Sequence, residues 1–164
     1  MCTADAKRGD EAQPDTAPAA AGAVETTVAL EDAGQSIADA RHLAIAFLDR
    51  ARTEHLVAVS LKAVELAQLV VSELVTNARK YAPGPVVLRL RIIAATVEIS
   101  VWDSQPDLPL ARVADPSRVG QHGLEIVTAI AQKVEIRREG AGKRITARLL
   151  LDDAPDTSPD PCVA

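Results

Sequence analysis

Hydrophobic and polar residues follow regular patterns only in the middle of the chain. Residues 1–23 and 152–164 are rich in Ala, Pro and Asp and show no apolar period. Segments of this composition bury too little apolar surface to offset the entropy of ordering. We therefore predict disordered tails at 1–23 and 152–164. Between them we predict one folded domain over 24–151, because 164 residues with 48% hydrophobic composition fit a single core.

The first helix of this domain is predicted over 35–52. Ser36 is a candidate N-cap, and Asp39 follows three residues later as the analogue of a capping box. Apolar residues then recur at helical spacing, and they include Ile37, Ala44 and Phe47. This apolar face has two interpretations: it belongs to the core of the domain, or it is a contact surface for a homodimer or another partner.

A second helix is predicted over 56–81, where apolar residues recur every three to four positions. It ends at the sequence Ala82-Pro83-Gly84-Pro85, because proline cannot continue a helix and restricts the residue before it. Val24–Leu30, which precedes both helices, alternates weakly and is predicted as an edge strand.

Alternation of period two predicts a hairpin after the second helix. Its strands are Val86–Ile93 and Thr96–Trp102, and Ala94-Ala95 forms the turn. The residues expected to face the helices are Val97, Ile99 and Val101.

Residues 104–121 contain three prolines and little periodicity, which predicts a functional lid or a disordered loop. A helical pattern follows from Gly123, and a second hairpin is predicted from Val134–Arg138 and Arg144–Leu151. Runs of helices and hairpins favour an α+β two-layer sandwich, in which a mixed, mostly antiparallel sheet is covered on one face by about three helices.

Composition excludes some functional classes. The net charge of −5 and the pI near 5.2 argue against a general binder of nucleic acid or anionic membrane. No apolar run has the length of a membrane span, and the N-terminus lacks the apolar core of a signal peptide. Cys2 and Cys162 both lie in the predicted tails, which disfavours a disulfide framework or a zinc site. A cytoplasmic protein is therefore expected.

Glu73 and Asn77 are the strongest candidates for chemistry. They lie four residues apart on the second helix, so they project from the same face, at the seam between packed and solvated residues. Burial of a carboxylate and an amide without partners is costly, so a seam position suggests a pocket where a ligand completes their bonding. Taken alone, a Glu and an Asn on a helix edge are usually just solvated residues.

Two other elements converge on the same chemistry. Asp103 follows an inward-facing strand, and a buried carboxylate there can accept from an exocyclic amine, which discriminates adenine from guanine. Gly120 and Gly123 precede a helix, whose first N–H groups can bind an anion. An Asn oxygen can share Mg²⁺ with phosphate oxygens, and a nearby carboxylate can take a proton from an attacking hydroxyl.

On these residues the chain resembles the GHKL (histidine-kinase-like, or Bergerat) ATP-binding fold. Glu73-Leu-Val-Thr-Asn77-Ala resembles its N-box, and Asp103 with Pro106 is similar to its first glycine box. Gly120-Gln-His-Gly-Leu-Glu-Ile-Val127 resembles its second glycine box. Within the family the chain is most similar to anti-sigma-factor serine kinases and to small stand-alone ATP-binding regulators of actinobacteria. The resemblance covers residues 24–151.

The resemblance implies ATP and Mg²⁺ as cofactors and gives a role to each motif. Asn77 would ligate magnesium, Glu73 would act as the general base, and Asp103 would hold the adenine amine. Further nucleotide-binding residues are implied at Gly120, Gln121, His122, Gly123 and Leu124.

Four side chains near these motifs keep two interpretations each. Lys80 and Arg79 either reach phosphate or form a solvated helix end. His122 either contacts phosphate or is an exposed loop residue, and Trp102 is expected to pack on the sheet rather than stack on adenine.

The resemblance further implies transfer of the ATP γ-phosphate to a Ser or Thr of an antagonist protein, with a sigma factor as the alternative partner. One departure weighs against catalysis: the first glycine box reads Asp103-Ser-Gln-Pro-Asp107, without glycine. A module that binds nucleotide or a partner without transferring phosphate is therefore the second hypothesis. The third is a detached histidine-kinase catalytic domain, since no phospho-accepting histidine region is recognised before residue 24.

Overall fold

The computed structural model describes residues 24–31, 37–81, 84–106 and 122–152. The predicted tails at 1–23 and 152–164 lie outside the described residues except for Asp152, and so do residues 107–121 of the predicted lid, 104–121. The candidate residues Gly120 and Gln121 and the proposed cap Ser36 fall in these undescribed stretches.

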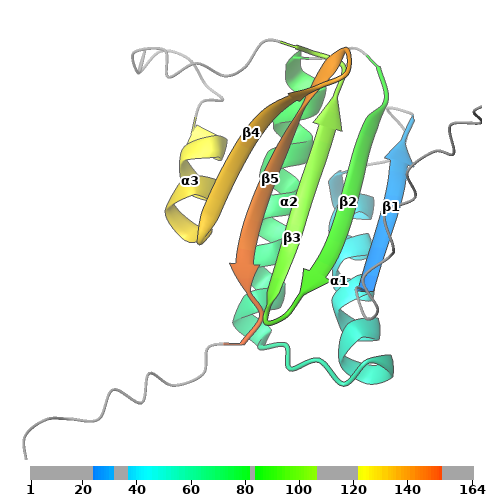
Figure 1. Ribbon diagram of the computed structural model, residues 1–164, viewed down its shortest axis with the longest axis vertical. Coiled ribbons are helices and arrows are strands. Elements are labelled where there is room, and N and C mark those ends of the chain that lie inside the picture. The colour runs from blue at the N-terminus through cyan, green and yellow to red at the C-terminus, as the bar shows by residue number, and fades with distance from the viewer. Residues whose placement is uncertain (1–23, 32–36, 82–83, 107–121, 153–164) are drawn as a thin grey trace, which may run out of the picture.

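The described chain forms a five-stranded sheet and three helices (Figure 1). The helices are α1 (Ile37–Glu54), α2 (Leu61–Tyr81) and α3 (His122–Ile130). The strands are β1 (Val24–Leu30), β2 (Val86–Ile93), β3 (Thr96–Asp103), β4 (Lys133–Glu139) and β5 (Gly142–Leu150). Their order in the sheet is β1-β2-β3-β5-β4.

The predicted α+β sandwich is confirmed, with one correction to the sheet. All four described strand pairings are antiparallel, so the sheet is not mixed. Two hairpins, β2–β3 and β4–β5, lie side by side because β5 pairs with β3. β1 pairs with β2 although α1 and α2 separate the two strands in the sequence, and this pairing is antiparallel as well.

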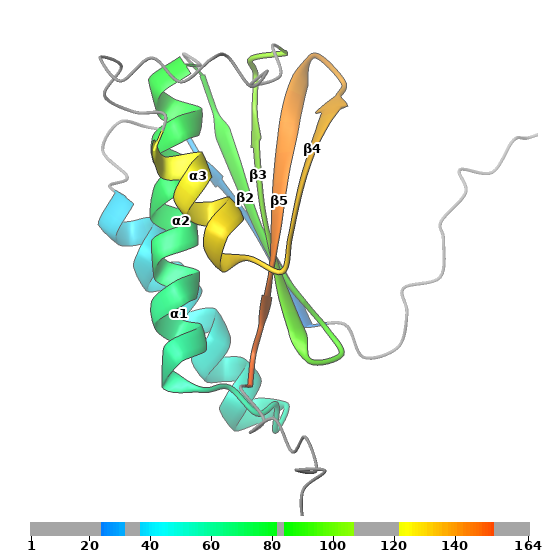
Figure 2. The same ribbon diagram turned by 90° about the vertical axis from the view of Figure 1, so that its left-hand side faces the viewer.

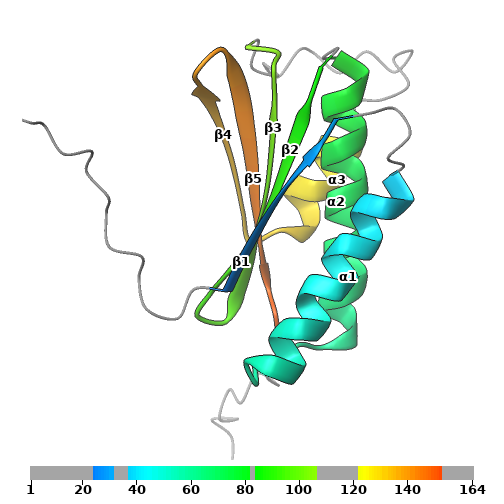
Figure 3. The same cartoon turned by 90° about the vertical axis from the view of Figure 1, so that its right-hand side faces the viewer.

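The helices lie on one face of the sheet, as the two side views show (Figures 2 and 3). Inward positions on the central strands are apolar and buried, and outward positions are mostly charged or polar. The core lies between these inward positions and the buried face of α2, which contacts β2, β3, β5 and both other helices. None of the described helices has the combination of length and apolar character needed to span a bilayer.

Ala44 and Phe47 of α1 are only 1% and 4% exposed, so the core interpretation of this face is confirmed for them. The predicted orientation of β3 is also confirmed, since Val97, Ile99 and Val101 are all buried.

The predicted start of the second helix is wrong by five residues. Residues 56–60 are not helical, and Leu56 has a backbone φ of 53°. Ser60 caps α2 instead: its Oγ accepts a hydrogen bond from the N–H of Ala63 at 3.0 Å. The apolar residues between 56 and 59 continue a helical spacing, but a serine cap satisfies the free N–H groups of the first turn and fixes the boundary there.

A glycine fixes how closely β5 approaches β3. A Cβ placed on Gly142 would lie 1.9 Å from the carbonyl oxygen of Asp103 and 2.8 Å from the ring of Trp102. No larger residue fits there without a shift of the backbone. The register that follows pairs Asp103 with Lys143, so these two residues lie opposite each other at the edge where β3 ends and β5 begins.

Candidate functional site

The end of the sandwich at the top of Figure 1 holds the sequence-predicted residues. There α2 and β3 end and β5 begins, and α3 starts in the same half of the molecule (Figures 1 and 2). Glu73 and Asn77 lie in the second half of α2, and both are half-buried, as a seam position requires. Among the described residues neither side chain has a hydrogen bond or ion pair, so each keeps its bonding capacity for a ligand.

Glu73 faces the first turn of α3. A Cβ built on Gly123 would lie 2.3 Å from Glu73 Oε2, so a larger residue there would displace the end of the Glu73 side chain. The first turn of a helix carries free N–H groups and the positive end of the helix dipole. The structure therefore brings the N-box and the described part of the second glycine box together, with an acceptor carboxylate beside an anion-binding helix end.

Asp103 is 1% exposed and lies at the inward-facing end of β3. Its Oδ1 accepts from the N–H of Gln105 at 2.9 Å and from Lys143 Nζ at 3.0 Å. Both described hydrogen bonds thus fall on one oxygen, and Oδ2 has none among the described residues. Asp103 is thus buried at the end of its strand, as predicted, and it carries a partner that the sequence analysis did not name.

Lys143 is the functional candidate that the sequence analysis missed. It is 3% exposed, which is rare for a lysine. A signal was present: Lys143 has the same parity as Ile145, Ala147 and Leu149, the buried positions of β5. Period-two alternation places it inward, opposite a carboxylate in the neighbouring strand.

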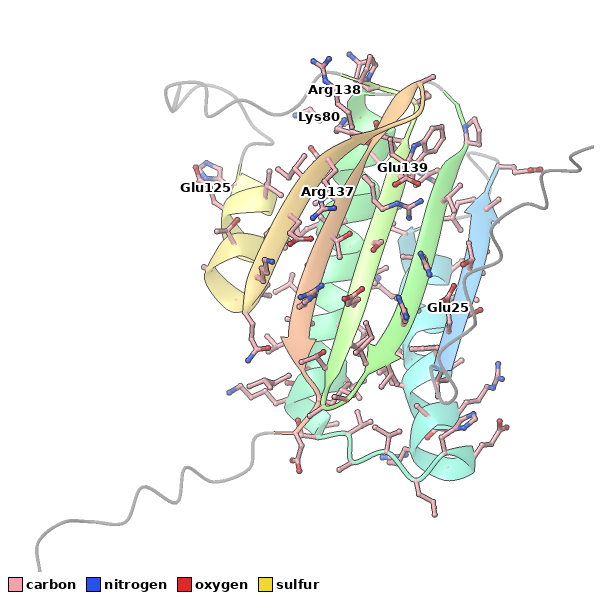
Figure 4. All side chains as sticks on the ribbon, viewed as in Figure 1. Glu25, Lys80, Glu125, Arg137, Arg138 and Glu139 are labelled. Atoms are coloured by element: carbon pink, nitrogen blue, oxygen red, sulfur yellow. The ribbon has the colours of Figure 1, made fainter. Side chains whose placement is uncertain are left out.

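The remaining candidates are less buried. His122 is exposed at the first residue of α3, and its Nδ1 lies 3.5 Å from Glu125 Oε2. Leu124 is half-buried and packs against the core. Lys80 is exposed in the last turn of α2, at the same end of the molecule as Arg138 (Figure 4).

The donor set fits ATP with magnesium. No group of three or more His, Cys, Asp or Glu side chains able to hold a metal occurs among the described residues. Mg²⁺ commonly takes only one or two protein ligands and completes its shell with phosphate oxygens and water. The Asn77 amide oxygen suits that type of site, and the close approach at Gly123 suits phosphate.

A cavity of about 420 Å³ reaches Glu73 from the helical side. Residues of both long helices line it, among them Arg41 of α1 and Leu69 of α2. Asp103 does not line this cavity, so it is an approach to Glu73 separate from the end of the sheet where Asp103 lies.

The described pKa shifts lie away from this site, on the open face of the sheet. A hydrogen bond from Arg89 lowers the pKa of Glu25, and one from Arg144 lowers the pKa of Glu139. Figure 4 shows Glu25 and Glu139 on that open face. These pairs stabilise the exposed surface of the sheet and do not tune the candidate site.

Comparison with known proteins identifies the family of the chain. No curated protein matches the chain. Among solved structures, the chain is similar to the Acinetobacter baumannii histidine kinase AdeS, with 12% identity, a TM-score of 0.43, and coverage of 78% of this chain and 68% of that chain. The family "Histidine kinase-like ATPase domain" matches residues 30–149, which include both N-box residues and the described part of the second glycine box. This protein therefore belongs to the histidine kinase-like ATPase domain family, a family of ATP-binding, kinase-like domains.

Proposed function

We propose that this protein is an ATP- and Mg²⁺-dependent regulator of the anti-sigma factor kinase type. In this proposal it transfers the ATP γ-phosphate to a Ser or Thr of an antagonist protein and thereby controls a sigma factor in the cytoplasm. The observation that carries the proposal is the contact of Glu73 with the first turn of α3 at Gly123. It places a carboxylate that has no partner among the described residues beside the helix end that suits the phosphates.

Phosphoryl transfer requires three functions of the chain: binding the phosphates, orienting the metal-bound end of the nucleotide and accepting a proton. The free N–H groups at the start of α3 hold the phosphates, and Asn77 orients the metal-bound end of the nucleotide through its amide oxygen. Glu73 accepts the proton of the serine or threonine hydroxyl as its oxygen forms the new bond to phosphorus. ATP supplies the phosphoryl group, and magnesium neutralises charge on its oxygens.

The cavity beside Glu73 supports a protein substrate. It opens on the helical side of the molecule and offers a hydroxyl-bearing segment a route to the carboxylate. An arginine, Arg41, and an exposed leucine, Leu69, line it, so it has both a charged and an apolar contact for such a segment. A site built only to hydrolyse ATP would not need this second approach.

The test is phosphoryl transfer from γ-labelled ATP to a candidate antagonist protein, with binding measured in parallel. Glu73→Gln should abolish transfer while magnesium-dependent ATP binding remains within about threefold, because the substitution keeps the size of the side chain and removes its basicity. Glu54→Gln, an exposed position at the far end of α1, is the matched control and should transfer label normally. Transfer retained in Glu73→Gln would remove Glu73 as the base.

A second candidate function is a binding module without transfer. The observation that favours it is at Asp103, where the following residues contain no glycine and Lys143 already occupies one carboxylate oxygen. This candidate predicts ATP binding without label on any protein partner. Label that is stable to alkali and lost in acid would instead favour the detached histidine-kinase domain, since phosphohistidine differs from phosphoserine in this respect.

A further inference from the structure

We propose that Lys143 is a base-reading residue, which donates a hydrogen bond to N1 of adenine while Asp103 accepts from the 6-amino group. This inference rests on the proposed ATP binding and deepens it. Asp103 and Lys143 lie directly opposite each other in the register of β3 and β5, and both are almost completely buried. The pair therefore presents its free bonding positions away from bulk water.

The hydrogen bonds of the pair leave one donor and one acceptor unused. An ammonium group has three N–H donors. Lys143 Nζ donates to Asp103 Oδ1 at 3.0 Å and to the carbonyl of Gln105 at 3.4 Å, and among the described residues it has no third acceptor. Asp103 Oδ1 accepts twice, and Oδ2 accepts from no described group. An N–H donor of Lys143 and a carboxylate oxygen of Asp103 thus lie near each other, and neither has a partner in the part of the chain that the structure describes.

The pairing edge of adenine is complementary to this arrangement. Its 6-amino group is a donor, and the adjacent ring nitrogen N1 is an acceptor. A carboxylate alone satisfies the amino group and leaves N1 to water. With Lys143 beside it, the site can satisfy both atoms directly, and because the groups are buried each hydrogen bond contributes more than it would in water.

A purely structural role is the competing explanation. Lys143 could serve only to neutralise a buried carboxylate and to tie the residues after β3, through the carbonyl of Gln105, to β5. In that case loss of Lys143 would lower the stability of the fold and weaken the binding of all nucleotides equally. The two explanations differ in one measurable property. If Lys143 binds N1, replacing N1 of the base by C–H weakens binding only when Lys143 is present.

The experiment compares the full-length protein with Mg²⁺ and three nucleotides: ATP, 1-deaza-ATP, in which a C–H replaces N1, and purine riboside triphosphate, which lacks the 6-amino group. Wild type should bind 1-deaza-ATP at least about tenfold more weakly than ATP, since a charged donor is left unpaired. In Lys143→Met the ratio of the dissociation constants of 1-deaza-ATP and ATP should fall to about one, while purine riboside triphosphate should still bind more weakly than ATP. In Asp103→Asn, 1-deaza-ATP should still bind more weakly than ATP, whereas purine riboside triphosphate should bind about as tightly as ATP.

Lys133→Met, an exposed lysine on β4 paired with Glu135, is the matched control and should keep both penalties. Lys143→Arg keeps N–H donors and should retain the penalty for 1-deaza-ATP. Equal binding of ATP and 1-deaza-ATP by wild type would overturn the inference whatever the variants do. So would a penalty that persists unchanged in Lys143→Met or, if that variant does not fold, in Asp103→Asn/Lys143→Met. Absence of any ATP binding by wild type would instead refute the proposed function itself.

Discussion

The carboxylate of Glu73 occupies the space that a side chain at position 123 would need. A Cβ on Gly123 would come within 2.3 Å of Glu73 Oε2, a separation that non-bonded atoms do not adopt. Two motifs that are about fifty residues apart in the sequence thus meet at this contact. The position of the predicted base and the identity of the glycine depend on each other.

Gly123→Ala should therefore displace Glu73 and reduce phosphoryl transfer strongly. The atom that must move is the end of a flexible, half-buried side chain, so the melting temperature should change little. The measurement is thermal unfolding together with transfer from labelled ATP. Glu73→Ala removes the clashing atoms, so the double variant Glu73→Ala/Gly123→Ala should be about as stable as Glu73→Ala alone. A loss of stability in Gly123→Ala that persists in the double variant would show that the contact is not its cause.

Asn77→Ala should weaken ATP binding when magnesium is present and change it little when magnesium is chelated. The amide oxygen is half-buried and has no described protein partner, so its loss removes a ligand and disturbs no hydrogen bond within the chain. We expect at least about a tenfold loss with magnesium, equivalent to about 1.4 kcal/mol. The measurement is calorimetric titration with and without a chelator. An equal loss in both conditions would assign Asn77 to the nucleotide rather than to the metal.

Much of the fold could be predicted because its patterns are local. Alternation in β2 and β3 is nearly perfect, and proline ends α2 whatever surrounds it. The start of α2 was harder, since apolar residues at 56–59 continue the helical spacing and the deciding feature is a single hydrogen bond to Ser60 Oγ. The pairing type of the sheet depends on which hairpins meet, and periodicity does not contain that information.

The residues of the candidate site also fall into two groups, those with a local sequence signal and those that depend on strand pairing. Glu73 and Asn77 could be found from their spacing on a helix, and Asp103 from its place after an alternating strand. Lys143 was missed because its importance is a matter of register: it becomes significant only when β5 pairs with β3 and places it opposite Asp103. Such a contact between residues 40 positions apart has no local signal beyond the parity of one buried lysine.

The Asp103–Lys143 pair should contribute strongly to stability when one partner alone is removed. Both side chains are almost fully buried, so Lys143→Met leaves a buried carboxylate without its counter-charge, and the free energy of unfolding should fall by about 3–5 kcal/mol. Asp103→Asn/Lys143→Met removes both charges and should recover most of this loss. Urea denaturation of the single and double variants measures the coupling. A double variant as unstable as the sum of the two single variants would show that the charges are independent.

Glu25 should make stability depend on pH in the acid range. Arg89 donates two hydrogen bonds of 2.9 Å to its carboxylate and thereby holds the pKa of Glu25 below its usual value. The folded protein therefore binds this proton less readily than the unfolded chain, so the pair stabilises the fold above the unfolded pKa, about 4.3, and this contribution disappears as the pH falls through the lower folded pKa. Because the pair is about one-third exposed, it should contribute roughly 0.5–1 kcal/mol.

The measurement is urea denaturation of wild type and Glu25→Gln between pH 2 and 7, with Glu54→Gln as the control. Wild type should exceed Glu25→Gln in stability at pH 7, and the two curves should converge at the acid end, where the carboxylate is protonated in both states. Addition of salt at neutral pH should reduce the difference, because the pair is partly solvated and its charges are screened. A difference that is constant across the whole range would mean that Glu25 stabilises β1 by packing, and that its ion pair with Arg89 contributes nothing.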